Sequence, residues 1–246
     1  MRIYSSCLEA VKEIERDLYE MGVTYQSYSF QNKFVENNKD YETKELMGYS
    51  YCLTGWDDLL DTKLFKFFNL DEDISRRWIY QEALERFDLQ HIHNPGISYT
   101  YREEVWKPFL VGKGKNLKFH YTYSERLFQQ INRAIEELKE KKYSRQVVLE
   151  VYQSILDMNS WGGIKRVPCS LEYHFLRRPT EKGDKLNLIY YMRSCDFYTH
   201  FIFDMIMGIK LLEFMSEKIE VPRGNFIHII SSLHTFYKDY EKRGIF

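Results

Sequence analysis

The chain has 246 residues, of which 44% are hydrophobic and 17% aromatic, and its formal net charge is −1 at pH 7. This length and apolar content suffice to bury a core, and they favour one α/β or α+β domain. The balanced charge excludes the overall basic field typical of nucleic-acid-binding proteins, so we expect a small-molecule or protein partner and no DNA or RNA.

Cysteine usage and hydropathy both predict a cytoplasmic protein. The cysteines show neither a Cys-x-x-Cys pair nor the spacing of a zinc site, and they stand at positions 7, 52, 169 and 195. Without a recognisable secretory signal, this pattern indicates a reducing compartment and no metal centre. The most apolar stretch, Phe201 to Met215, is interrupted by Asp204, Lys210 and Glu213, so it predicts a buried helix and no membrane span.

The first 142 residues are expected to form helices around one strand. A helix is predicted from Tyr4 to Met21, ending at Gly22, because apolar residues recur at helical spacing. Residues 43–54 alternate enough to predict a strand. Further helices are expected from Arg76 to Phe87 and from Tyr123 to Lys142. The inner stripe of the last helix comprises Leu127, Ile131, Ile135 and Leu138.

After residue 144 the pattern changes to β-structure. Strand-like runs occupy residues 145–152, 170–177, 185–194 and 225–234. Residues Asp196 to Lys218 instead predict a long core helix. This order predicts an α+β fold with one large sheet. Breaks at residues 94–96, 112–115 and 162–163 are typical of surface loops, so residues 1–246 are expected to form a single domain.

A specific set of motifs begins with Arg166-Val167-Pro168-Cys169-Ser170. It continues through Met192-Arg193-Ser194-Cys195-Asp196, then Phe203-Asp204, and closes with Ser232-Leu233-His234. In this order the set resembles thymidylate synthases and the phage-type deoxycytidylate hydroxymethylases that share their fold. The resemblance covers roughly residues 117–237. It implies a large mixed or antiparallel sheet with flanking helices and a homodimer formed through that sheet.

The resemblance assigns Cys169 as the nucleophile. A thiolate that adds to carbon 6 of a pyrimidine makes carbon 5 nucleophilic, and sulfur can later leave. Nearby arginines are expected to lower the pKa of this thiol. The alternative is that Cys169 is buried and inert, as cysteines often are. For Cys195 that second interpretation, buried and passive, is the preferred one.

Arginines of the motifs are expected at the substrate phosphate, because guanidinium groups donate to phosphate in a planar fork. The resemblance places Arg193 and Ser194 in the site, and Arg145 in the site of the neighbouring subunit. Gln146 stands where a second arginine is expected, and Arg166 could compensate. The alternative for any one of these arginines is a solvated surface charge.

Asp204 stands where thymidylate synthases have asparagine and where the hydroxymethylases of the family also have aspartate. A carboxyl group can accept from the amino group of cytosine and, when protonated, donate to N3. The sequence therefore favours a cytosine base. The alternative is that the helix is shifted and Asp204 is exposed to solvent.

The remaining site residues follow from the resemblance alone. Glu82, in a segment that continues to Asn94-Pro95-Gly96 and Trp106, is expected to be the general acid and base, with Glu85 as a competitor. Asp196 is expected near the base and the folate, and it could equally cap the following helix. His234 is expected at the 3′-hydroxyl of the sugar, and Tyr121 in the substrate site.

The predicted reaction transfers a one-carbon unit from 5,10-methylenetetrahydrofolate to carbon 5 of CMP or dCMP through a Cys169 adduct. Only twelve residues follow His234, where the family continues into a tail that closes the site, and this favours hydroxymethylation over a methylation that must exclude water. Two alternatives stay open: a methylating synthase of dTMP or 5-methyl-dCMP, and a catalytically silent relative that binds nucleotide.

Overall fold

The computed structural model describes residues 1–30, 33–158 and 166–241. The helices are α1 (Cys7–Met21), α2 (Thr62–Phe67), α3 (Glu72–Arg86), α4 (Glu103–Trp106), α5 (Tyr123–Glu140), α6 (Ser154–Asp157), α7 (Ile202–Ile219) and α8 (Tyr237–Glu241). The strands are β1 (Arg2–Tyr4), β2 (Val23–Gln26), β3 (Ser29–Phe30), β4 (Lys33–Phe34), β5 (Glu42–Leu53), β6 (Val148–Glu150), β7 (Ser170–Thr180), β8 (Gly183–Met192), β9 (Cys195–Asp196) and β10 (Arg223–Phe236). In the described ranges, no helix has the length and apolarity needed to cross a membrane.

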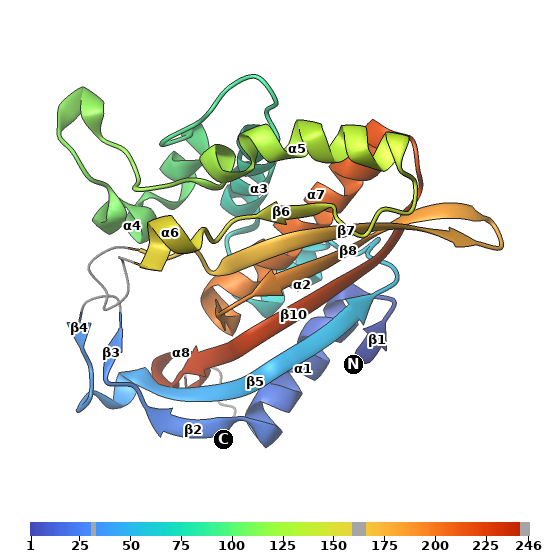
Figure 1. Cartoon of the computed structure of the whole chain (residues 1–246). Coiled ribbons are helices and arrows are strands. Elements are labelled where there is room, and N and C mark those ends of the chain that lie inside the picture. Colours follow the sequence, from blue (N-terminus) through green and yellow to red (C-terminus); the bar gives the residue numbers. More distant parts are fainter. Residues whose placement is uncertain (31–32, 159–165, 242–246) are drawn as a thin grey trace.

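One large mixed sheet organises the molecule (Figure 1). Its strands run in the order β1-β5-β10-β8-β7-β6, and the short strands β2 and β9 pair with β5 and β10. Strand β10 is antiparallel to β5 and parallel to β8, while β7 and β8 form an antiparallel hairpin. The predicted α+β fold with a large mixed sheet and flanking helices is confirmed.

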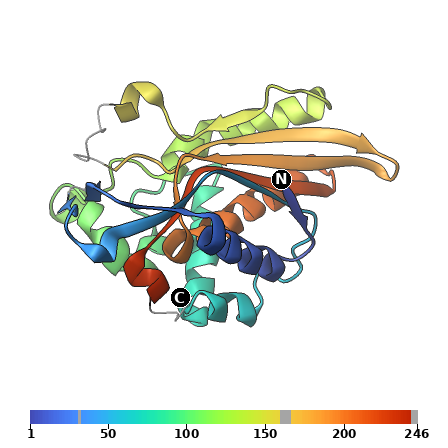
Figure 2. The ribbon, with the colours of Figure 1, turned by 90° about the horizontal axis from the view of Figure 1, so that it is seen from below.

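Helices cover one face of this sheet, as Figure 2 shows for α1, α3 and α7. Because side chains alternate along a strand, every second residue points to these helices and is buried. On the central strands this buried row includes Tyr51, Tyr173, Tyr190 and Phe226, each at most 1% exposed. The expected inner stripe of α5 packs here as well, although Ile135 is only partly buried.

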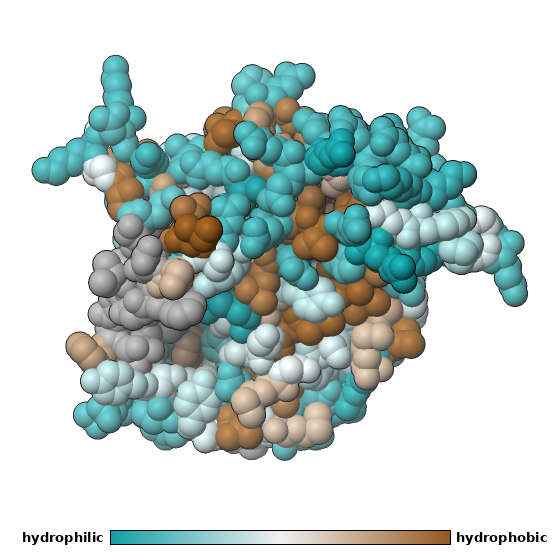
Figure 3. Space-filling view, viewed as in Figure 1, coloured by the Kyte–Doolittle hydropathy of each residue, from teal (hydrophilic) through white to brown (hydrophobic). Residues whose placement is uncertain are grey.

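The other face of the sheet is turned toward the viewer in Figure 1, and no helix crosses its central strands. Here the alternate residues are apolar and only half-buried, namely Ile189, Tyr191, Ile227 and Ile229. Ile227 and Ile229 pair with Ile189 and Tyr191 across β10 and β8. Brown and pale residues gather over the middle of this face in Figure 3. We refer to these four residues as the open sheet face.

Several predicted boundaries were wrong at their ends. Helix α1 begins at Cys7, because Ser6 accepts a hydrogen bond from the Glu9 N–H as its N-cap and Arg2–Tyr4 pairs with β5. The helix expected from Asp196 begins with a π-helical turn over Phe197–Phe201, and α7 follows at Ile202. Within residues 145–152 only β6 forms a strand. The expected loop at residues 162–163 lies outside the described residues.

Candidate active site

A cavity of about 370 Å³ lies where α3, α7 and the loop before α5 meet the ends of β8 and β10. Nine of the ten residues expected in the site line it: Glu82, Tyr121, Arg166, Cys169, Arg193, Ser194, Asp196, Asp204 and His234. The tenth, Arg145, does not line the cavity. Its carbonyl oxygen lies 3.0 Å from His174 Nε2, next to β7. The cavity thus collects side chains from segments more than 150 residues apart.

Cys169 is held in the turn just before β7. The Arg193 backbone N–H donates to the Cys169 carbonyl at 2.9 Å. The guanidinium of Arg193 donates to the carbonyls of Pro168 (2.9 Å) and Val167 (3.0 Å), and its Nη2 lies 3.9 Å from the Cys169 sulfur. Arg193 therefore fixes the turn that carries Cys169. Among the described residues its Nη1 has no hydrogen-bond partner, so that nitrogen can still face a substrate.

The electrostatic setting of Cys169 corrects one expectation. Burial raises the pKa of the thiol above its ordinary value, and this effect exceeds the lowering by Arg193 and Arg166. The sulfur can be reached from the cavity, yet it lies deep among protein atoms that replace water. The arginines act in the expected direction, but they do not make Cys169 a thiolate in the protein without its substrate.

Asp204 lies in the first turn of α7 and lines the cavity, so the solvent-exposed alternative does not hold. Burial raises the pKa of its carboxyl to about 6, against a smaller lowering by Arg86, a hydrogen bond from Cys195, and two further arginines. The Cys195 sulfur lies 3.7 Å from Asp204 Oδ2. Cys195 is buried as expected, and its thiol donates to this carboxylate.

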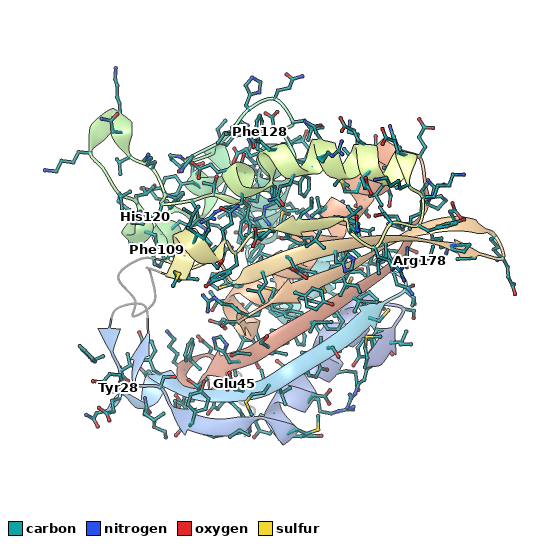
Figure 4. The ribbon with its side chains drawn as sticks, in the orientation of Figure 1. Tyr28, Glu45, Phe109, His120, Phe128 and Arg178 are labelled. Carbon is teal, nitrogen blue, oxygen red and sulfur yellow. The ribbon has the colours of Figure 1, made fainter. Side chains whose placement is uncertain are left out.

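Asp196 and His234 are brought together by the pairing of β9 with β10, where they are direct partners in the register. Asp196 also accepts from the Thr199 N–H at 3.4 Å, which caps the π-helical turn as anticipated. His234 Nδ1 lies 3.4 Å from the hydroxyl of Ser232, which donates to Glu45 on β5. Figure 4 shows Glu45 at this end of the sheet.

The carboxylates of α3 form a separate group within the cavity wall. Glu82 makes an ion pair with Arg86 at 2.6 Å, one helical turn further on. Glu85 accepts from Gln81 at 2.8 Å. The hydroxyl of Ser98 lies 2.8 Å from Glu82 Oε2 and 2.7 Å from Glu85 Oε2. Glu82 and Glu85, the two candidates for the general acid and base, are therefore bridged by one serine hydroxyl in the cavity wall.

Aromatic rings and arginines form the rest of the wall. The Arg166 guanidinium lies 4.0 Å from the Trp106 ring centroid, and the Trp106 ring stacks on His200 at 5.6 Å. Phe109, also within 5.6 Å of Arg166, lies beside α4 in Figure 4. The buried hydroxyl of Tyr121 has no hydrogen-bond partner in the described chain. It is available to a ligand.

Several lining residues were not expected from the sequence: Arg86, Ser98, Arg102, Cys195 and His200. The four-residue spacing of Glu82 and Arg86 was a usable signal for an ion pair on one helix face. Arg102 carries no such signal. It packs on the Phe203 ring at 4.1 Å, and burial lowers its pKa to about 10. Within the described ranges, no cluster of three or more His, Cys, Asp and Glu residues could hold a metal ion.

Comparison with known proteins agrees with this arrangement. A family model described as thymidylate synthase matches residues 42–243. A protein of Methanocaldococcus jannaschii named "Putative thymidylate synthase" is 32% identical over 154 residues, which are 57% of this chain and 67% of the relative. The bifunctional dihydrofolate reductase-thymidylate synthase of Paramecium tetraurelia is 26% identical over 65% of this chain, but the match spans 32% of that protein.

A solved structure shows the same fold. The thermostable thymidylate synthase A from Bacillus subtilis aligns with a TM-score of 0.63 and 13% sequence identity, over 97% of this chain and 83% of that one. The family match covers most of the chain, and the ordered motifs converge on one cavity. The chain therefore belongs to the thymidylate synthase family of one-carbon transferases.

Proposed function

We propose that this protein is a pyrimidine nucleotide C5 hydroxymethyltransferase that acts on CMP or dCMP through a covalent Cys169 adduct. The observation that carries the proposal is the pairing, in one cavity, of the Cys169 thiol with Asp204, an acid whose raised pKa of about 6 lets it exchange a proton with a bound base near neutral pH. A nucleophile and a proton donor are the two groups needed to add sulfur to an aromatic pyrimidine.

The Cys169 step begins with loss of the thiol proton, because burial keeps the thiol protonated. The sulfur then bonds to carbon 6, and the electron pair of the ring double bond moves toward N3. A proton from Asp204 neutralises this charge. Carbon 5 next bonds to the one-carbon unit and loses its hydrogen as a proton. The bond between that unit and its carrier breaks, and water adds to the resulting methylene group, losing one proton, to give the hydroxymethyl group. N3 then returns its proton to Asp204 as the Cys169 sulfur is expelled, which restores the ring. Glu82, which also lines the cavity, is the group proposed to move protons at carbon 5.

Asp204 favours cytosine because N3 of cytosine is a basic nitrogen. It can take the shared proton and leave a charge-assisted N–H···O contact with the carboxylate, while the exocyclic amino group donates to the other oxygen. Uracil carries a hydrogen on N3 and a weakly basic oxygen beside it. The buried carboxylate would then face that oxygen without a proton at neutral pH, which costs binding energy.

The phosphate is proposed to lie near Arg193 and Ser194 at the end of β8. Arg193 holds the Cys169 turn through Nε and Nη2, so its Nη1 is left to donate to the phosphate. Arg166, which also lines the cavity, adds a second positive charge, and the buried Tyr121 hydroxyl is an unused donor. His234 is the group proposed to contact the sugar.

The donor is proposed to be 5,10-methylenetetrahydrofolate, which supplies a one-carbon unit at the oxidation level of formaldehyde. The cavity wall suits a flat heteroaromatic group, because Trp78, Trp106 and Phe119 line it together with Tyr99. These side chains would hold and orient the donor and keep bulk water away from carbon 5.

The open sheet face supports the proposed homodimer. Four apolar side chains on two adjacent central strands stay half-exposed in the single chain, and a second copy would cover them. Arg145 lies on the same side of the sheet. Tyr173 and Phe175 of β7 point to the buried face, so His174 between them points to the open face, where it contacts the Arg145 carbonyl. This position suits an arginine that serves the partner's cavity.

Mixed dimers test the shared site. Refolding Cys169→Ala and Arg145→Ala chains together should restore about a quarter of the normal activity, because half of the dimers are mixed and each has one intact site. If Arg145 serves its own subunit, or the protein is a monomer by light scattering, no activity returns.

The reaction itself is tested by mass spectrometry after incubation with methylenetetrahydrofolate and CMP, dCMP, UMP or dUMP. Addition of CH2O to a cytosine nucleotide, absent with Cys169→Ala, supports the proposal. Addition of CH2 would identify a methylating synthase instead. An Asp204→Asn variant is the matched probe of base choice, and it should shift turnover from cytosine toward uracil. Nucleotide binding without any product would indicate a silent relative.

A further inference from the structure

Ser98 links the two carboxylates of α3 in a way that fixes the number of protons between them. Its hydroxyl oxygen lies 2.8 Å from Glu82 Oε2 and 2.7 Å from Glu85 Oε2. A serine hydroxyl has one hydrogen, so it can donate to only one of these oxygens. The other short contact needs a hydrogen from the carboxyl side. The geometry therefore calls for one proton shared by Glu82 and Glu85.

The surroundings of the two groups differ, and the difference shows which one holds the proton. Glu82 accepts two hydrogen bonds from the Arg86 guanidinium, which stabilises its ionised form. Glu85 is 5% exposed and accepts from neutral donors, the Gln81 amide and the Ser98 backbone N–H. In the described chain no cationic side chain lies within ion-pair distance of Glu85. An ionised Glu85 would thus be buried without a counter-charge.

We propose that Glu85, Ser98 and Glu82 form a proton relay in which Glu85 stores the proton that Glu82 delivers to the nucleotide. Glu85 gives its proton to the Ser98 oxygen while the Ser98 hydrogen passes to Glu82. Two O–H bonds break and two form, and the net charge of the relay does not change. Glu85 is a positioning residue here, since Glu82 alone faces the reacting atoms. The inference rests on the proposed role of Glu82.

Other charged groups face the relay from each neighbouring element. Arg86 belongs to α3 itself and contacts only Glu82 of the pair. Arg102, from the 3-10 helix Ile97–Arg102, is coupled to both Glu82 and Asp204. Asp204 on α7 adds negative charge, and His93, which also lines the cavity, is held by Asp88. None of these cations reaches Glu85, so its proton is not displaced by a positive charge.

A purely structural role for Glu85 predicts different behaviour. Through the Ser98 N–H, Glu85 also anchors the start of the 3-10 helix. A glutamine at position 85 keeps an oxygen for that bond, so Glu85→Gln should be silent if anchoring is its whole function. If Glu85 stores a proton, the same variant loses the store while the fold is kept. Near-UV circular dichroism and the unfolding midpoint establish that the fold is kept.

Infrared difference spectroscopy tests the stored proton without any substrate. The spectrum of the protein minus that of Glu85→Gln at neutral pH should show the C=O stretching band of a protonated carboxyl. The contribution of Asp204 cancels in the difference. Glu104→Gln, at an exposed position of α4, is the matched control and should give no such band. Absence of the band for Glu85→Gln overturns the proposal.

The relay is tested by exchange of the C5 hydrogen of the preferred nucleotide in deuterated water, which needs the Cys169 adduct but no donor. In Glu85→Gln the decline of exchange on the alkaline side should move to lower pH by about one unit or more. The increase of exchange with pH that reports ionisation of the Cys169 thiol should keep its position. Ser98→Ala should reproduce the alkaline shift with both carboxylates in place. A profile that superimposes on that of the unaltered protein in both variants overturns the relay.

The two measurements separate this inference from the proposed function. If the unaltered protein exchanges no C5 hydrogen with any of the four nucleotides, the proposed function fails, and the infrared band still decides whether Glu85 is protonated. If exchange occurs but neither variant changes its pH profile, the proposed function stands and the relay fails.

Discussion

Asp204→Asn is expected to stabilise the fold at neutral pH, although it removes a residue of the candidate site. The pKa of the Asp204 carboxyl rises from 3.8 to about 6, mainly because of burial. At 1.36 kcal/mol per pKa unit, this difference corresponds to roughly 3 kcal/mol of cost for the ionised form. Asparagine has nearly the same shape and carries no charge, so it avoids this cost.

The sign of the effect depends on pH. A carboxyl whose folded-state pKa lies above its unfolded value binds its proton more tightly in the folded protein. Ionised Asp204 therefore destabilises the fold above about pH 6, and the penalty disappears as the pH falls toward 4. Asp204→Asn should add up to about 3 kcal/mol at pH 7.5, and its advantage should shrink to near zero at pH 4.

Urea unfolding at pH 4, 5.5 and 7.5 measures this dependence. The protein concentration is held fixed, because the apparent stability of the proposed dimer would vary with concentration. The matched control is Glu181→Gln, an exposed carboxylate in the turn between β7 and β8. A stability gain that is the same at all three values, or a loss at pH 7.5, would refute the claim that Asp204 is a desolvated acid.

Three further predictions concern other parts of the molecule. Gly208→Ala should destabilise α7 by about 1–3 kcal/mol in urea unfolding, because the added carbon would lie 2.7 Å from Phe226 Cε2; unchanged stability would show that this contact relaxes freely. Alkylation of Cys169 by iodoacetamide should be slow at neutral pH and accelerate with rising pH, and Arg193→Gln should slow it further; a variant that reacts faster would contradict the role of the guanidinium. Burial would raise the pKa of Asp58, but hydrogen bonds from the first turn of α1 outweigh it and lower the pKa. Asp58→Ala should therefore cost about 1–2 kcal/mol above pH 4, and less below it, as thermal unfolding can show.

The sequence alone was enough to predict the fold class and to select most of the residues that line the cavity. Periodicity located α5 and β5 to within a few residues, because an amphipathic helix and an alternating strand leave their pattern in the chain itself. The ordered motifs from Arg166 to His234 named seven lining residues, and the resemblance added Glu82 and Tyr121. Each motif is local, so it stays readable even where the rest of the chain has diverged.

Tertiary structure decided what those residues do to one another. Burial, which no local pattern records, reverses the expected net effect on the Cys169 pKa and raises that of Asp204. Ser98 stands 13 residues after Glu85, and only the folded loop brings its hydroxyl between two carboxylates. Proton sharing depends on distances of less than 3 Å and on the absence of water, and both are properties of packing between distant segments. For that reason the sequence determines which ionisable groups the site contains, and the tertiary structure determines their protonation states.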